Sequence, residues 1–472
     1  MLRDYDDIPD EEVASFLSIA EIRTLKYVHL QVVQTSPSTI GSDTLCKFVT
    51  EVSSKLSLES NCAIDVDGGV FGDRVRKKTS PTKTPKPKGT TPKLPTTPVL
   101  QTTLTPETTQ KPGRTPKPRR TPKPKRIYGH IDSDLHVNDY DAVDQKHFKW
   151  MKMGEVWQRA FPHVTRKAKV AVMDSGINWD DRDFDPLFGY LEKQSGGYLK
   201  GGWNFFDNSP FLTNKFNHGT QVCKILAAKA NNSVSIAGMA QNVTLVPLQV
   251  VDDNERAPLS KLVAAIDMAI NVRVDIAAIS VGFKFSSREA AQRALLLQAL
   301  HAAQEHNILV VSPAGNDGVD ASDVLPCSFG GPRAICVAAM MDWKKLNVLH
   351  SKSNFGPKVD IAAFGYRILT GRLTDAPGGR LRSFSGTCAS SAFAAGALAI
   401  LISMGVDSGT AKQLIEESTD EMNYIIPDSS TESKVELSMF SRPSNAPSAG
   451  FPQSNAACMM QLALLRLSDC GS

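Results

Sequence analysis

The sequence predicts an α/β protein whose mainly parallel sheet is covered by helices, with a small αβ domain in front of it. Short apolar runs alternate with longer amphipathic segments through most of the chain, which is the pattern of strand, crossover helix and parallel strand. A basic Thr- and Pro-rich stretch separates this region from a shorter one at the amino terminus. In such folds, crossovers are right-handed and sites form outside the carboxyl ends of the strands.

The expected elements follow from hydrophobic periodicity. Strands are expected where short apolar runs rich in β-branched residues occur, at 169–173, 244–251, 275–281 and 308–311. Helices are expected where apolar residues recur at three- and four-residue spacing, at 259–270, 289–306 and 389–404. Because the two kinds of element alternate in chain order, they are expected to build one sheet with helices on both faces.

Four chemically capable residues stand at the ends of these elements. Asp174 and Asn316 each follow an apolar strand, His218 lies near a helix start, and Cys388 opens the helix at 389–404. A carboxylate can orient an imidazole, and the imidazole can then act as a base. A side-chain amide can stabilise an oxyanion, and a helix amino terminus stabilises a thiolate.

The segments that hold these residues are Asp174-Ser175-Gly176, His218-Gly219-Thr220, Ser312-Pro313-Ala314-Gly315-Asn316 and Gly386-Thr387-Cys388-Ala389-Ser390. Their order and flanking glycines resemble the subtilisin family of serine peptidases, and the resemblance covers about 138–423. It implies a subtilisin-like three-layer fold. It also implies that Asp174 orients His218, that His218 is general base and then acid, and that Asn316 donates to the oxyanion. Cys388 occupies the position of the nucleophilic serine.

The chain departs from the family pattern in two places. Family members typically carry serine, methionine, two small residues and proline where this chain has Cys388, Ala389, Ser390, Ser391 and Ala392. A strand that normally ends in Asn-x-Ser-x-Gly is here Ala278-Ile279-Ser280-Val281-Gly282, and Phe283 replaces the second glycine of that segment. Substrate subsites are therefore expected to be narrower.

The resemblance also implies where a protein or peptide substrate binds. The walls of the primary specificity pocket would be Ser280, Val281, Gly282, Pro313, Ala314 and Gly315. Their backbones would pair with an extended substrate strand. Asp317 and Asp323 indicate tolerance for basic substrate residues, although ordinary surface acids would give the same sequence.

The predicted function is an endopeptidase that hydrolyses peptide bonds through an acyl-enzyme intermediate on Cys388. A thiolate beside an imidazolium attacks readily, but the longer C–S bond is expected to slow amide cleavage by moving the oxyanion from its donors. Acyl transfer to amines and esterase activity are variants of the same mechanism. The alternative hypothesis is a catalytically silent binding protein on the same fold, in which Cys388 is a small buried residue.

A structural calcium ion is a further implication of the resemblance, at Asp183 and Asn232 with nearby backbone carbonyls. Oxygen ligands of this kind suit calcium. The segment around Asn232 is equally typical of an ordinary turn, or of a glycosylation acceptor at Asn231.

The chain is expected to divide into an N-terminal segment, a propeptide-like αβ domain, a basic linker, a peptidase domain and a mostly disordered tail, at 1–19, 20–75, 76–126, 135–425 and 426–472. The propeptide-like domain should hold a strand at 28–32, a helix after Ser42-Asp43 and a strand at 63–66. The family uses such a domain as a folding chaperone and inhibitor. An unrelated adaptor domain is the alternative.

The linker has fifteen Lys and Arg residues against the single acid Glu107, whereas the whole chain has a net charge of only +4. Proline and like charges predict an extended spacer. Docking on an anionic polysaccharide, a membrane or a nucleic acid, and O-linked sugars, are the alternatives. Because the remainder is acidic, no specific nucleic-acid partner is predicted for the protein as a whole.

Cysteine spacing favours an extracellular or secretory location. Cys327 and Cys336 flank a turn and can form a disulfide, and Cys458 with Cys470 can form another. Residues 1–12 contain no apolar core of the kind found in signal peptides, so no secretory signal is predicted there. The apolar stretch at 459–467 is too short to span a bilayer, and no transmembrane helix is predicted. A monomer is expected.

Overall fold

The structure is a computed structural model that describes residues 19–35, 63, 65, 67–70, 131–184, 187–213, 215, 217–343, 346–372, 380–422 and 437–440. The predicted linker, the helix expected after Ser42-Asp43 and the pair Cys458 and Cys470 lie outside these residues. Residues 1–73 and 128–472 belong to one compact unit, so the described amino-terminal strands and the later elements can be treated together.

A ten-stranded sheet forms the centre of the described part, in the order β19-β20-β16-β14-β12-β10-β4-β8-β7, with β15 paired to β14. Its parallel strands are β4 (Ala168–Asp174), β7 (Trp203–Asn204), β8 (Val243–Gln249), β10 (Ile276–Ile279), β12 (Leu309–Pro313), β14 (Ala334–Trp343), β16 (Ile361–Phe364) and β20 (Leu437–Phe440). The antiparallel members are β15 (Leu346–Leu349) and β19 (Thr419–Met422). The predicted mainly parallel sheet is therefore confirmed.

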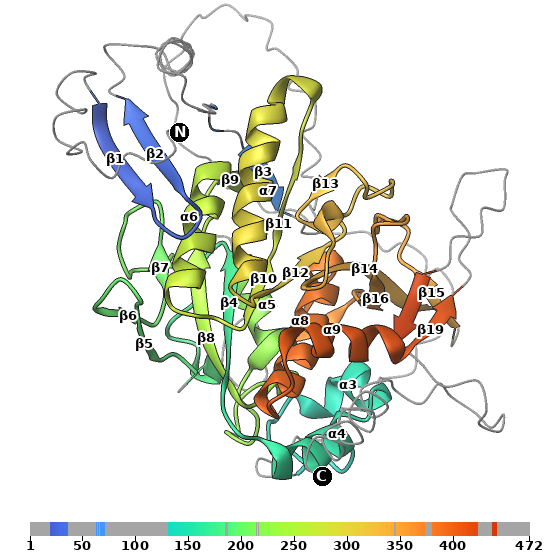
Figure 1. The fold of residues 1–472 in the computed structure, drawn as a ribbon. Helices are drawn as coiled ribbons and strands as arrows, with labels where there is room; N and C mark the ends of the chain where they lie inside the picture. Colours follow the sequence, from blue (N-terminus) through green and yellow to red (C-terminus); the bar gives the residue numbers. More distant parts are fainter. Residues whose placement is uncertain are drawn as a thin grey trace, which may run out of the picture. The chain divides into compact units, whose positions relative to one another are not determined.

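Helices cover both faces of this sheet (Figure 1). Along β4, Val170 and Val172 pack with α5 (His218–Ala227) and α8 (Thr387–Ser403), while Ala171 and Met173 pack with α6 (Leu259–Asn271) and α7 (Ala290–Glu305). Successive side chains of a strand point to opposite faces, so an uninterrupted apolar run produces this double burial. The result is the predicted three-layer α/β fold.

The helix α8 runs through the interior of its layer. All of its residues from Thr387 to Ser403 are buried, as expected for a helix that is apolar or small on every side. At Gly396 an added Cβ would lie 2.4 Å from Met239 Cβ, so glycine allows the close approach of this neighbour. The packing fixes the position of the helix amino terminus, where Cys388 lies.

Smaller elements surround this core. The other described helices are α3 (Lys146–Trp150), α4 (Met153–Ala160), α9 (Ser408–Glu417) and the 3-10 turns η1 (Ala142–Asp144), η2 (Phe161–His163), η3 (Arg182–Phe184), η4 (Ser287–Glu289) and η5 (Cys327–Phe329). Two-stranded pairs are formed by β1 (Ile19–Leu25) with β2 (Leu30–Thr35), β5 (Tyr190–Glu192) with β6 (Tyr198–Lys200), and β17 (Ile368–Arg372) with β18 (Leu381–Phe384). None of the described helices has both the length and the apolar character needed to cross a membrane.

A second sheet lies beside the central one, in the order β13-β11-β3-β9. Its strands are β13 (Val324–Leu325), β11 (Val281–Lys284), β3 (Asp67–Val70) and β9 (Arg256–Pro258). The strand expected at 275–281 is divided, because the chain leaves the central sheet after β10 and enters this second sheet as β11. The strand expected at 28–32 corresponds to β2, Leu30–Thr35, whereas the nearest described strand to the one expected at 63–66 is β3, Asp67–Val70.

The β1–β2 hairpin packs on α6 and α7. Asp267 of α6 accepts hydrogen bonds from the backbone nitrogens of Tyr27 and Val28, at 2.7 and 3.3 Å. From α7, Gln298 Nε2 donates to the carbonyl of Val28 at 2.8 Å. Val28 is fully buried at this contact. Burial raises the pKa of Asp267 to about 6, although the two backbone donors oppose that rise.

Candidate active site

Asp174 and His218 meet where β4 ends and α5 begins. His218 Nδ1 lies 2.8 and 2.9 Å from the two carboxylate oxygens of Asp174, and both side chains are buried. This contact fixes the ring orientation and directs Nε2 away from the carboxylate. The hydroxyl of Ser175 accepts from Gly219 N at 3.1 Å, which ties the two segments together.

Two glycines allow these segments to approach. A Cβ on Gly219 would lie 2.2 Å from the carbonyl oxygen of Gly176, and a Cβ on Gly176 would lie 2.3 Å from that of Thr213. Gly176 also has a φ of +87°, which favours glycine. The glycine in each sequence motif therefore has a direct steric role in bringing the carboxylate to the imidazole.

Cys388 completes a line of three residues. It is the second residue of α8 and is fully buried, with Sγ 3.7 Å from the carbonyl oxygen of Ser280. Burial opposes a charge on His218, but the nearby Asp174 and then Cys388 outweigh it, so the His218 pKa lies well above its ordinary value. The site thus favours an imidazolium beside the sulfur.

Asn316 supplies a donor at the start of α8. Its Oδ1 accepts from the Thr387 backbone nitrogen at 3.0 Å, while its Nδ2 is buried and has no hydrogen-bond partner among the described residues. Gly386 has a φ of +127°, and a Cβ there would lie 3.0 Å from Asn316 Nδ2. The arrangement places an amide N–H group close to Gly386, next to the start of α8.

The loop that carries Asn316 is braced by Asn354, a residue that the sequence analysis missed. Its Oδ1 accepts from the backbone nitrogens of Asp317 and Val319, at 3.0 and 3.2 Å, and its Nδ2 donates to the Ala314 carbonyl at 2.9 Å. Asn354 is fully buried. Only the polar pair before Phe355-Gly356 marks this position in the sequence, and such a pair is common in turns.

The predicted pocket walls lie at neighbouring strand ends. Ser280, Val281 and Gly282 lead from β10 into β11. Pro313 ends β12, the neighbour of β10 in the sheet, and Ala314 and Gly315 follow it. The backbone nitrogen of Gly315 donates to Thr387 Oγ1 at 3.2 Å, which connects this wall to α8. Asp317 forms an exposed ion pair with Lys284, at 2.8 Å.

Comparison with known proteins gives this site a context. Residues 165–438 match the profile of the subtilase family, Peptidase S8. The chain belongs to the subtilase family. It is 30% identical over 255 residues to the thermophilic serine proteinase of Bacillus sp. (strain AK1), covering 54% of this chain and 57% of that relative. It is 27% identical over 256 residues to thermitase of Thermoactinomyces vulgaris, covering 54% of this chain and 82% of thermitase.

Two solved structures share the subtilase fold. Fervidolysin from Fervidobacterium pennivorans, a keratinolytic enzyme related to subtilisin, superposes with a TM-score of 0.51 at 18% identity, over 72% of this chain and 50% of that one. A lanthipeptide protease superposes with a TM-score of 0.50 at 20% identity, over 68% of this chain and 96% of that one. The likeness confirms the fold.

The positions at which the subtilase resemblance implies calcium hold a different cation. Lys224 Nζ lies 2.8 Å from Asp181 Oδ2 and 3.2 Å from Asp183 Oδ2, and all three side chains are buried. Asn232 points its amide nitrogen at Asp183 Oδ1, at 3.4 Å, and its own oxygen accepts from Val234 N. An ammonium group and an N–H donor at this carboxylate do not fit calcium, which takes about six to eight oxygen ligands.

In the adjoining loop, too, N–H donors face a carboxylate. Asp139 accepts from the backbone nitrogens of Asn231 and Asn232, at 2.8 and 3.4 Å, so N–H groups face this buried carboxylate. Within the described part of the chain, no group of three or more His, Cys, Asp and Glu side chains is placed to hold a metal ion.

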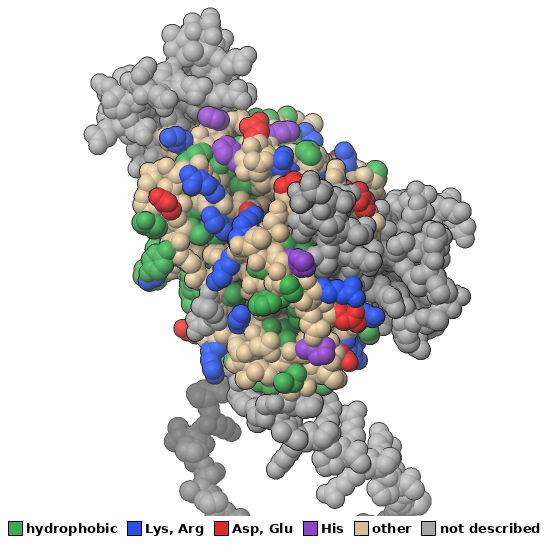
Figure 2. All heavy atoms as spheres, turned by 60° about the horizontal axis from the view of Figure 1, so that its bottom comes forward, with side chains coloured by type: hydrophobic (Ala, Val, Ile, Leu, Met, Phe, Trp, Pro, Cys, Tyr) green, Lys and Arg blue, Asp and Glu red, His purple; other side chains and the backbone are tan. Residues whose placement is uncertain are grey.

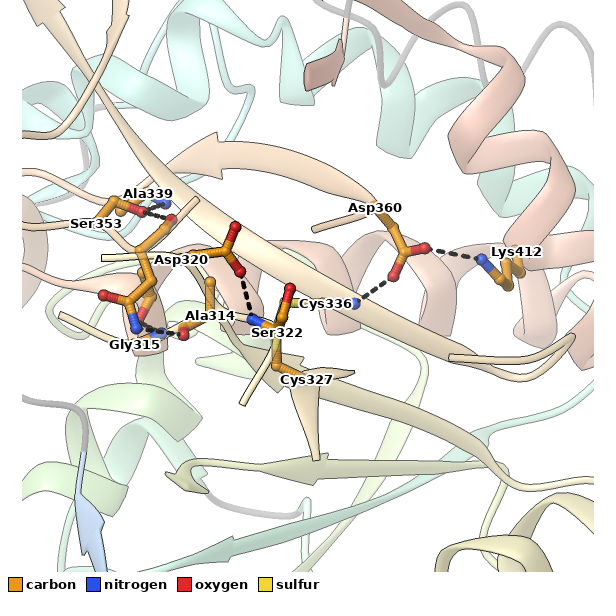
Figure 3. The surroundings of a disulfide bond; sticks show 12 residues. Ala314, Gly315, Asp320, Ser322, Cys327, Cys336, Ala339, Ser353, Asp360 and Lys412 are labelled. Atoms are coloured by element: carbon orange, nitrogen blue, oxygen red, sulfur yellow. Dashed lines mark hydrogen bonds and ion pairs between the residues drawn. A yellow bond between two sulfur atoms is a disulfide. The ribbon is translucent and has the colours of Figure 1, made fainter. Parts of the chain in front are cut away.

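The disulfide predicted between Cys327 and Cys336 is confirmed and joins η5 to β14. Figure 3 shows its surroundings, where Asp360 accepts from the backbone nitrogen of Cys336 at 2.7 Å and faces Lys412. Among the described residues, Cys223 and Cys388 are the cysteines outside a disulfide, and both are buried. Figure 2 shows Lys and Arg side chains scattered among apolar and uncharged ones on the face that it views.

Proposed function

We propose that this subtilase is an endopeptidase that hydrolyses peptide bonds through an acyl-enzyme intermediate on Cys388. The observation that carries the proposal is the convergence of Asp174, His218 and Cys388 near the amide nitrogen of Asn316, which has no hydrogen-bond partner in the described part of the chain. The relatives named as proteinases support the same class of activity. The match spans just over half the length of the first of them, so the activity of the whole protein is part of the proposal.

The proposed reaction starts with transfer of the thiol proton to His218, which forms a thiolate and an imidazolium held by Asp174. The thiolate attacks the substrate carbonyl carbon, and the resulting oxyanion is stabilised by Asn316 Nδ2 and the first turn of α8. His218 returns the proton to the leaving amine as the C–N bond breaks. Water, deprotonated by His218, then cleaves the thioester and restores the thiol.

The proposed partners are a protein or peptide substrate and the amino-terminal region of the chain itself as an inhibitor. Support for the second comes from β3, which pairs in antiparallel fashion with β11 at the predicted substrate edge, and from the β1–β2 hairpin on α6 and α7. A strand that occupies this edge excludes a substrate strand from it. We propose the segment at 20–75 as a propeptide-like domain on this basis.

The remaining proposals concern the setting of the enzyme. The proposed location is outside the cell or in the secretory pathway, and the Cys327–Cys336 disulfide supports it, since such bonds persist in oxidising compartments. The protein is proposed to act as a monomer. The basic segment at 76–126 is proposed as a spacer between the propeptide-like domain and the peptidase domain at 135–425. We do not propose a structural calcium ion at Asp183 and Asn232, because the contacts of these residues do not fit its ligand requirements.

A catalytically silent binding protein is the second candidate, favoured by the complete burial of Cys388. Iodoacetamide labelling of the full chain, mapped by mass spectrometry, separates the two. Cys223 is an internal control, because it is equally buried and its burial raises the pKa of its thiol. If the protein is an enzyme, iodoacetamide should label Cys388 much faster than Cys223, and this difference in labelling rate should disappear in the His218→Ala variant. Equal rates in the unmodified chain would support the silent protein.

A further inference from the structure

The edge that receives β3 has a defined register. Gly69 pairs with Gly282 and Val70 pairs with Val281 on the β11 side, while Gly68 pairs with Ala257 on the β9 side. The strand therefore lies between two backbones and runs toward Ser280. Since the Ser280 carbonyl is 3.7 Å from Cys388 Sγ, a peptide bound in the same register presents its carboxyl-terminal end to the sulfur.

One side chain of this edge closes the space beside the bound strand. A Cβ added to Gly68 would lie 2.7 Å from Phe283 Cζ and within 2.9 Å of both Cε atoms. Real Cβ atoms do not approach other carbons so closely, so any side chain here would have to displace the ring. Gly68 is not among the glycines with positive φ. The restriction therefore comes from Phe283 and not from the backbone conformation of the strand.

Phe283 has little room to yield. It is 2% exposed, and its ring stacks on that of Phe285 with 5.8 Å between centroids and 6° between planes. Its backbone is paired on the far side with Leu325 of β13. Displacing such a ring opens a void or strains neighbouring side chains, and either change weakens binding of the strand.

We propose that Phe283 is a specificity-determining residue that restricts the peptide-binding edge to strands carrying glycine at the position of Gly68. If a bound peptide keeps this register, the residue opposite Ser280 carries the carbonyl group that is attacked. The peptide residue in the place of Gly68 lies three positions before it and is therefore the fourth residue before the cleaved bond. The inference deepens the proposed function, because it names the class of peptide that this site accepts. The chain's own segment Gly68-Gly69-Val70 satisfies the restriction.

The first test needs no catalysis. Hydrogen exchange of the full chain measures protection of the β9 and β11 amides that pair with β3. The Gly68→Ala variant should increase their exchange by about tenfold or more, because the added Cβ meets Phe283. The Gly68→Ala, Phe283→Ala double variant should recover the protection of Phe283→Ala alone. Phe285→Ala is the comparison variant: it removes the ring that stacks on Phe283 but leaves Phe283 itself, so it should rescue Gly68→Ala less than Phe283→Ala does.

Unchanged exchange in Gly68→Ala, or equal rescue by Phe285→Ala, would overturn the assignment. The second test measures kcat/KM for peptides X-Gly-Val-Phe joined to a fluorogenic amine, with X as Gly, Ala or Leu. For the unmodified chain, kcat/KM should be about tenfold or more higher for the glycine peptide than for the alanine and leucine peptides. For Phe283→Ala, the three values should lie within about twofold of one another. A chain that fails to cleave any peptide refutes the proposed function, whereas the exchange result still decides the role of Phe283.

Discussion

Replacing Lys224 with methionine should destabilise the fold and leave a site that responds to calcium. Lys224 is 3% exposed and faces Asp181 and Asp183, which are also buried. Methionine keeps the length and apolar stem of the side chain but removes the ammonium. The two carboxylates then remain close together without their counter-charge, which is the costly case of a broken buried ion pair.

The magnitude depends on pH because Asp183 titrates near neutrality. Burial raises its pKa to about 7, and the attraction of Lys224 only partly opposes that rise. A carboxyl group whose folded pKa exceeds its unfolded value stabilises the fold fully below the unfolded pKa, and this contribution is lost as pH rises through the folded pKa. Loss of Lys224 raises the folded pKa of Asp183 further, so the penalty should grow between pH 5 and pH 8.

At pH 8 the expected cost is about 3 kcal/mol, the lower end for removing one partner of a buried pair. This corresponds to a fall in Tm of roughly 6 to 12 °C for a domain of this size. At pH 5 the cost should be less than half as large. Thermal unfolding followed by circular dichroism, with EDTA or with millimolar calcium, measures both. Lys229→Met is the control, because Lys229 lies just beyond the same helix and has no ion pair among the described residues.

Calcium should raise the Tm of Lys224→Met and leave that of the unmodified chain unchanged. The argument would be refuted if calcium stabilised the unmodified chain and Asp183→Asn abolished that effect, since Asp183 would then be a calcium ligand in the presence of Lys224. It would also fail if Lys224→Met and Lys229→Met had the same Tm at pH 8.

Three further predictions test the site and its support. Asn316→Ala should lower kcat for peptide hydrolysis by about 10²- to 10³-fold, because its amide N–H stabilises the oxyanion, and it should also lower Tm, because the Thr387 backbone nitrogen loses its acceptor; an unchanged kcat would remove Asn316 from the mechanism. Cys388→Ser should raise the rate of peptide-bond hydrolysis, measured on fluorogenic peptides, if Asn316 is placed for an oxygen adduct; a fully inactive variant would argue against intact machinery. Replacing Cys327 and Cys336 with serine should lower the free energy of unfolding, measured by denaturant titration, by about 2–3 kcal/mol, since the disulfide closes a loop with a sequence separation of nine residues. A loss below about 0.5 kcal/mol, which is typical of surface substitutions, would refute the estimate.

The central elements could be predicted because their local pattern and their tertiary role agree. The strand expected at 169–173 is β4, Ala168–Asp174, and the helix expected at 389–404 is α8, Thr387–Ser403. Both are apolar and buried, so burial reinforces the preference already visible in the sequence. The boundaries shift by one or two residues because Asp174 and Thr387 belong to the elements whose ends they mark.

Two strands, β3 and β20, were harder to predict. β3 is Asp-Gly-Gly-Val, a sequence without alternating apolar residues, and it is a strand because β9 and β11 pair with it. β20 lies in a segment predicted to be mostly disordered, and its pairing with β16 and β19 likewise depends on distant partners. Partners far apart in sequence leave no local signal.

Lys224 shows the same limit for the site. It lies among Val222, Cys223, Ile225 and Leu226 on a buried helix, where a lysine in sequence suggests a solvent-exposed face. Its partners Asp181 and Asp183 come more than forty residues earlier. The sequence analysis predicted Asp183 as a calcium ligand, and only the coordinates reveal that this buried carboxylate faces the ammonium group of Lys224.

The packing around α8 explains why a cysteine nucleophile should change the rate rather than the architecture. A Cβ on Gly365 would lie 2.3 Å from Ser390 Oγ and 2.6 Å from Ala339 Cβ, so the turn before the helix is confined. Asn316 is held to the same turn through Thr387 N. The proposed oxyanion donor and the proposed nucleophile are therefore packed into one unit. Because this unit cannot shift to accommodate the longer C–S bond, the misfit must appear in the oxyanion contact, and an oxygen at position 388 should relieve it.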